Sequence, residues 1–217
     1  MPTSRQYTLT DRDADIVAAL VEKVRCLSIA QIAQHWWPSS RTPEELARQR
    51  MRQLVGRGLV DLVQVYARPR IALTAPIVCW QPGQPSPDFG PVSHQLKSRF
   101  HGPAVMTTVV VATRRAGELA GRKAGRPPRR PEATHDLGLA DVYLLLRRVD
   151  RPRALAWVSE SRLVEGGEGK WTKLPDAVIR LSGQPEQVVE FGGEYSKSKL
   201  NSFHADCVSR ERGYELW

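Results

Sequence analysis

Apolar and polar residues alternate with the period of an α-helix in the first third of the chain. A first helix is predicted to begin after Thr10, with Asp13 three residues later as the second half of a capping box. Its buried face would hold Ile16, Val17, Leu20, Val21 and Val24. A second, short helix follows Ser28 and ends before Pro38, because proline cannot continue a helix.

The third predicted helix has two different faces. Pro43 suits its first position and Glu45 lies three residues after the candidate N-cap Thr42, so its start and register are specified. Its apolar stripe consists of Ala47, Met51, Leu54 and Val55. The polar face carries Glu45, Arg48, Gln49 and Arg52, and Arg41 precedes the helix. Since Arg and Gln fit guanine and adenine edges, this face is predicted to contact DNA bases.

A two-stranded hairpin is predicted directly after the third helix. Gly56 and Gly58 can end the helix. The strand LVDLVQVY would then turn through residues 67–70 into a second strand, IALT, at 71–74. Arg68 and Arg70 would lie at the tip of this hairpin, where Arg commonly enters a minor groove or contacts phosphate.

Three helices and a hairpin in this order predict a winged helix-turn-helix, a fold that places one helix in the DNA major groove. The partner would be double-stranded DNA. The alternative is a winged helix used only for protein contacts, in which Arg48 and Arg52 form a solvated face.

Composition agrees with a DNA partner without deciding it. The chain has 217 residues, 41% of them hydrophobic, and a net charge of +9, which favours a polyanionic partner. No stretch approaches the ~20 apolar residues of a membrane helix, and the N-terminus has no signal-peptide pattern, so a cytoplasmic protein without membrane contact is expected. Three widely spaced cysteines indicate neither a disulfide framework nor a zinc site.

Two segments divide the chain. Residues 81–91 are rich in Pro and Gly, and residues 114–134 are strongly basic. Arg126, Arg129 and Arg130 of this basic arm are candidates for contacts with a phosphate backbone, the alternative being a solvated loop. The predicted domains are a winged helix at 1–80, a linker and arm at 81–134, and a second domain at 135–217. Within the linker, VSHQLKSRF could be helical, and MTTVVVAT could be a strand or the start of a helix.

The second domain is predicted to be one mixed sheet. Its strands would be LGLADVYLLLRRV, ALAWVSESRL, LPDAVIRL and QVVEFGG, followed by a helix from residue 196 and a last strand, GYELW. The predicted fold class is therefore α+β.

Two carboxylates in this sheet indicate metal chemistry. Asp176 opens one strand and Glu190 ends the next, so adjacent strands would bring them together, where they could share Mg²⁺. This resembles the PD-(D/E)XK nuclease fold, whose motif places Lys two residues after the Glu. Here Gly192 stands at that position. Lys197 and Lys199 are the nearby candidates to replace the missing cation, and without one the site would be catalytically degenerate.

The segments LTDRDADIVAAL, CLSIAQIAQHWW, HDLGLADVYLLL, WVSESRL, PDAVI and VVEFGGE together resemble the replication-relaxation family of mobile-element proteins. Glu160, Asp176 and Glu190 match acidic positions of that family, and His135 matches as well. The resemblance implies a DNA-binding accessory protein for plasmid or integrative-element mobilisation or replication. A relaxase or replication protein, or a second copy of the chain, would be its protein partner.

Three other functions stay open from the sequence. They are an active Mg²⁺-dependent nuclease, a transcriptional repressor of its own operon, and a protein-interaction module.

Overall fold

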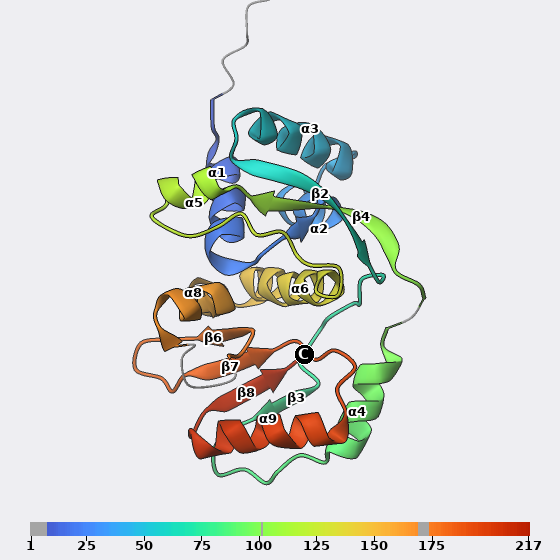
Figure 1. The fold of residues 1–217 in the computed structure, drawn as a ribbon, viewed down its shortest axis with the longest axis vertical. Coiled ribbons are helices and arrows are strands. Elements are labelled where there is room, and N and C mark those ends of the chain that lie inside the picture. The colour runs from blue at the N-terminus through green and yellow to red at the C-terminus, as the bar shows by residue number, and fades with distance from the viewer. Residues whose placement is uncertain (1–7, 101, 169–173) are drawn as a thin grey trace, which may run out of the picture.

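One long helix, α6 (Ala133–Val149), lies between two β-sheets (Figure 1). The structure, a computed structural model, describes residues 8–100, 102–168 and 174–217. Helices and strands are mixed along the chain, and the predicted α+β class is confirmed. We call the sheet below α6 in Figure 1 the lower sheet. Gly138 allows α6 to approach it closely, because a Cβ atom at this position would lie 2.1 Å from Cζ of Phe191.

The N-terminal helices largely follow the predicted pattern. They are α1 (Asp11–Ala18), continued by the π-helical turn η1 (Ala19–Lys23), then α2 (Ile29–Trp36) and α3 (Pro43–Gly56). The capping box of Thr10 and Asp13 is confirmed. Helix α2 follows Ser28 as predicted, and the structure adds a second capping box there, formed by Ser28 and Gln31.

Helix α3 begins as predicted, with Thr42 at the N-cap position and Pro43 as the first helical residue, but two details differ. The side chain of Thr42 makes no capping hydrogen bond; its backbone N–H instead donates to Oγ of Ser40 at 3.2 Å. Val55 is 37% exposed, whereas Ala47, Met51 and Leu54 are buried as predicted. The helix ends in a Schellman motif, with Gly58 at φ +66°.

The predicted partner of the strand after α3 is wrong. Strand β2 (Val60–Ala67) pairs along its whole length with β4 (Val105–Ala112), and the short β1 (Leu27–Ser28) pairs with the other edge of β4. Residues 71–74 form no strand. The β-branched β4 segment offers eight paired positions and a buried second half, residues 109–112, which the four residues of IALT cannot match. We call the antiparallel pair of β2 and β4 the ribbon.

The segment between β2 and β4 belongs to the lower sheet and the helices packed on it. Strand β3 (Val78–Trp80) is an edge strand there, and α4 (Phe89–Ser98) packs on α9 (Lys197–Ser209) before the chain returns to β4 (Figure 1). The predicted boundary after residue 80 therefore does not separate the two sheets. The ambiguous segments VSHQLKSRF and MTTVVVAT are mainly helix and strand, respectively.

The lower sheet has the order β3-β8-β7-β6-β5. Its other strands are β5 (Trp157–Ser159), β6 (Ala177–Ile179), β7 (Gln187–Glu190) and β8 (Gly213–Leu216). Among the described strands, β7 and β8 run parallel and the other neighbouring pairs are antiparallel, so the predicted mixed sheet is confirmed. The strands predicted in LPDAVIRL, QVVEFGG and GYELW, and the helix from residue 196, are also confirmed.

The strand predicted in LGLADVYLLLRRV is wrong, because this segment is α6. A helix packed between two sheets is apolar around most of its circumference, so its sequence lacks the one-sided period of a surface helix. The segment ALAWVSESRL is divided among the end of α7 (Arg151–Leu155), β5 and α8 (Glu160–Glu165). Across the described ranges, no helix is long and apolar enough to span a bilayer.

Candidate nucleic-acid interface and carboxylate site

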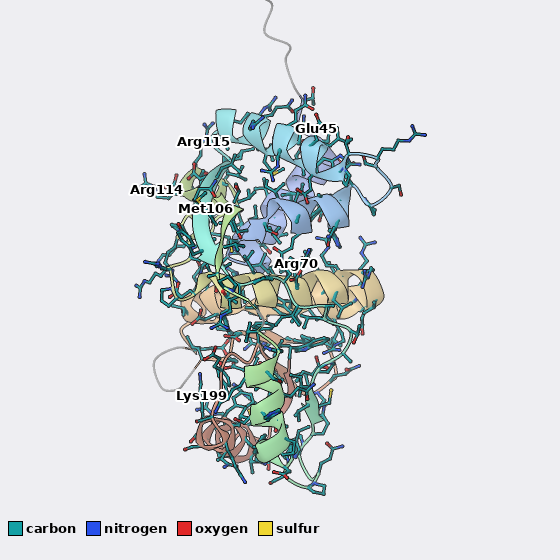
Figure 2. All side chains as sticks on the ribbon, turned by 90° about the vertical axis from the view of Figure 1, so that its right-hand side faces the viewer. Glu45, Arg70, Met106, Arg114, Arg115 and Lys199 are labelled. Atoms are coloured by element: carbon teal, nitrogen blue, oxygen red, sulfur yellow. The ribbon has the colours of Figure 1, made fainter. Side chains whose placement is uncertain are left out.

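The outer face of α3 carries the predicted base-contacting side chains. Arg41, Glu45, Arg48, Gln49 and Arg52 are all exposed, and Figure 2 shows Glu45 on the outer surface of α3. Arg48 lies 3.6 Å from Glu44 in an exposed pair that is easily broken. Among the described residues, neither Gln49 nor Arg52 has a hydrogen-bond or ion-pair partner. This face is therefore available to an external ligand.

Arg50 of the same helix has a structural role that the sequence did not reveal. Its guanidinium forms two hydrogen bonds with the fully buried carboxylate of Asp13 in α1, one of them at 2.6 Å from Nε. Burial opposes the charge of Asp13, but hydrogen bonds from Arg50 and Thr10 outweigh it and lower the pKa of this carboxyl. The position of Arg50 next to the apolar stripe of α3 was the available signal.

Arg68 and Arg70 do not lie at the tip of a free hairpin, and this prediction is wrong. Arg70 binds Asp141 of α6 through Nε at 3.0 Å and Gln34 of α2 at 2.7 Å, and Figure 2 shows it close to α6. Arg68 binds Glu194 at 3.0 Å. Both side chains are exposed, but because the chain crosses between the sheets here, these cations also connect layers of the protein.

The basic arm lies along the folded body. It consists of the short helix α5 (Arg114–Leu119) and an irregular stretch up to residue 132. Arg126 is paired with Glu132 at 3.0 Å, whereas the side chain of Arg129 is exposed. The guanidinium carbon of Arg130 lies 5.5 Å from the ring centroid of Tyr66 in β2. The three predicted phosphate contacts are thus in three different environments.

Asp176 and Glu190 are neighbours in the sheet but bind different partners. Ala177 pairs with Val189, so the next pair outward along β6 and β7 would be Asp176 and Glu190. Oδ2 of Asp176 lies 2.9 Å from Nε2 of His135 in α6 and accepts the backbone N–H of Phe191 at 2.8 Å. Oε1 of the buried Glu190 accepts the hydroxyl of Tyr195 at 2.8 Å.

His135 places a positive charge next to Asp176. Burial disfavours the imidazolium, but the carboxylates of Asp176 and Asp136 outweigh that cost and raise the pKa of His135 to about 10. At neutral pH a protonated His135 therefore neutralises Asp176. A structural ion pair of this kind joins α6 to the lower sheet.

Glu160, the third predicted carboxylate, is held by a different cation. Its Oε2 lies 3.2 Å from Arg25, which also binds Asp136 at 2.8 Å and Glu132 at 3.2 Å. Arg25 was not identified from the sequence, where it lies between two predicted helices without any motif.

These carboxylates do not fit a shared Mg²⁺. Divalent cations need several converging oxygen ligands, whereas Asp176, Glu190 and Glu160 are bound to His135, Tyr195 and Arg25, respectively. Over the described part of the chain, no three His, Cys, Asp or Glu side chains are grouped for a metal. We therefore assign no metal-dependent step to this site.

The position of the motif lysine is closed by helix α4. A Cβ atom on Gly192 would lie 2.7 Å from Cδ2 of Leu96. Lys199 packs its ammonium 3.3 Å from the ring centroid of Tyr195, and Lys197 is exposed at the start of α9. The cation that contacts Gly192 is Arg99, which donates to its carbonyl oxygen.

Arg99 was missed because α4 fell within the predicted linker. Its guanidinium lies 4.4 Å from the ring centroid of Phe191. Burial lowers the pKa of Arg99 to about 10. It therefore fastens the end of α4 to the end of β7.

Comparison of the chain with protein-family models, curated proteins and solved structures gave no significant match.

Proposed function

We propose that this protein binds a defined sequence in double-stranded DNA through α3. The observation that carries the proposal is the exposed row of Arg48, Gln49 and Arg52 on a helix whose other side buries Ala47, Met51 and Leu54 in the core. Gln49 and Arg52 have no partner among the described residues, so binding DNA would break only the weak pair of Arg48 with Glu44. Bidentate contacts of Arg with guanine and of Gln with adenine fit this row.

The surroundings of α3 support the same function. Helices α1, α2 and α3 precede a ribbon that starts beside α3, which is the arrangement expected for a winged helix. Arg50 fixes α3 on α1 through the buried carboxylate of Asp13, so the helix would meet DNA as a rigid element. The net charge of +9 would favour the encounter.

In this proposal the lower sheet is a non-catalytic, nuclease-like layer. Its carboxylates already neutralise His135 and Arg25 or accept the hydroxyl of Tyr195, and Leu96 occupies the space beside Gly192. The resemblance to the replication-relaxation family extends the proposal to an accessory protein of plasmid or integrative-element mobilisation or replication.

Selection of bound duplexes from a random-sequence library, using the full chain, tests the central claim. We expect one motif to be enriched and to bind at least ~10³-fold more tightly than a scrambled duplex at the same salt concentration. Failure to enrich any motif would reject sequence-specific binding. In a parallel incubation with Mg²⁺ or Mn²⁺, nicking of plasmid that disappears in Asp176→Ala would instead favour the nuclease.

A further inference from the structure

One face of the ribbon carries three exposed apolar side chains, with the hydrogen-bonded pair of Gln64 and Thr108 between them. Tyr66 stands opposite Met106 in the register, and Leu62 lies four residues before Tyr66 on the same face of β2. Their exposed fractions are 50% for Tyr66, 66% for Met106 and 38% for Leu62. We call these three residues the ribbon strip. In Figure 2, Met106 lies in the upper half of the molecule, below α3.

The ribbon strip is not needed for the protein's own core. The opposite face of the ribbon is packed on α6, where Val65 and Val109 share a core with Leu137. On the face of the strip, burial is confined to the other half of the ribbon, where Val60, Val110 and Ala112 join the core under the N-terminal helices. Exposure of a large aromatic residue and a methionine at adjacent paired positions therefore points to an external partner.

The side chain of Arg130 lies beside the ribbon strip. The guanidinium carbon of Arg130 lies 5.5 Å from the ring centroid of Tyr66, and Arg130 has no ion pair within the described ranges. The carboxylate closest to it in sequence, Glu132, is bound by Arg25 and Arg126. An arginine beside exposed apolar side chains is the combination with which proteins occupy a DNA minor groove, since Arg follows its negative potential and apolar groups press on base steps.

We propose that the ribbon strip and Arg130 enter the minor groove of duplex DNA beside the site contacted by α3. This inference rests on the proposed function and assigns its minor-groove contact to Tyr66, Met106 and Arg130. A second copy of the chain is a less suitable occupant, because a symmetric contact through the strip would bring two Arg130 side chains together.

The test uses the full chain and the duplex that it enriches from the random library. Tyr66→Ala and Met106→Ala are compared with Val208→Ala, which shortens a 46%-exposed apolar side chain on α9. We expect each ribbon variant to weaken binding by about tenfold, as for loss of one specific contact to a base pair. Val208→Ala should bind as the unchanged protein does, and thermal melting should give the same midpoint for all of them.

A modified base distinguishes a minor-groove contact from other effects. Replacing adenine with 2,6-diaminopurine adds an amino group to the minor groove and leaves the major-groove edge of the pair unchanged. At the positions under the ribbon, this replacement should weaken binding of the unchanged protein about tenfold and have much less effect on Tyr66→Ala.

Each other outcome overturns the inference. If both ribbon variants bind as tightly as the unchanged protein, or if diaminopurine has no effect at any position, the strip does not occupy the groove. Sedimentation that shows a dimer converted to a monomer by Tyr66→Ala would make the strip a subunit interface. If the chain enriches no duplex, both the proposed function and the ribbon contact are rejected. If a duplex is enriched but the ribbon variants bind it as tightly as the unchanged protein, only the ribbon contact is rejected.

Discussion

The guanidinium of Arg70 binds the carboxylate of Asp141 through two nitrogens and so joins the crossing segment after β2 to the central helix α6. A third nitrogen of Arg70 donates to Gln34 in α2, 2.7 Å away. Asp141 is only 9% exposed, so water cannot readily replace Arg70 as its hydrogen-bond donor.

Removal of this contact should affect stability and not DNA binding. Arg70→Ala leaves a nearly buried carboxylate without its cation, and we expect a loss of about 1–3 kcal/mol in the free energy of unfolding. Urea denaturation measures the change, with the largely exposed Arg114→Ala as control. A loss of DNA affinity with unchanged stability would instead show that Arg70 contacts DNA.

Arginines on the two sides of α3 should behave in opposite ways. Arg48→Ala and Arg52→Ala should each weaken specific DNA binding by ~1–3 kcal/mol while the unfolding free energy stays unchanged. Arg50→Ala should instead cost about 3–5 kcal/mol of stability, because it leaves the fully buried Asp13 without its cation. Gel shifts and denaturation on the same three proteins measure both effects. Equal DNA affinity of Arg48→Ala, Arg52→Ala and the unchanged protein would remove α3 from the interface.

The arm should contribute to the salt dependence of binding at some positions and not at others. Arg129→Ala removes an exposed cation, so the slope of log affinity against log salt concentration should flatten by about one contact. Arg126 is already paired with Glu132, and Arg126→Ala should leave the slope unchanged. Sequence preference should be the same in both variants. An identical slope for Arg129→Ala and the unchanged protein would show that the arm does not contact phosphate.

Protonation of His135 should make stability depend on alkaline pH. Its pKa is raised from 6.5 to about 10 in the folded protein, so the folded state binds a proton that the unfolded state loses near pH 6.5. The stabilisation is complete below pH 6.5 and is lost as the pH rises toward 10. We expect the stability advantage of the unchanged protein over His135→Gln to shrink across this range, as measured by urea denaturation at several pH values. A constant difference from pH 6 to 10 would contradict a protonated His135.

Restoring the nuclease motif should fail for a steric reason. A side chain at position 192 meets Cδ2 of Leu96 at 2.7 Å from its Cβ atom, so Gly192→Lys should destabilise the protein without producing plasmid nicking. The double variant with Leu96→Ala should be more stable than the sum of the two single effects predicts, because the clash is relieved. Nicking by Gly192→Lys in Mg²⁺ would show that the carboxylates can still form a metal site.

Local secondary structure and the buried faces of several elements could be predicted from the sequence. Periodicity and side-chain preferences within a few residues predicted the capping box at Thr10, the start of α2 after Ser28, the buried stripe of Ala47, Met51 and Leu54, and the late strands around Val178 and Val188. The exposed arginines of α3 follow in the same way, because a register fixed by buried positions also fixes the opposite face.

Tertiary structure decided the features that depend on distant partners. The partner of β2 lies beyond an excursion through the lower sheet, and strand propensity cannot choose between IALT and the later β4. Helix α6 resembled a strand because sheets cover it on both sides, so its apolar residues have no single face. The roles of Arg70, Asp176 and Glu190 depend on their distant partners, which are Asp141, His135 and Tyr195, respectively. Such long-range ion pairs and hydrogen bonds leave no local pattern in the sequence.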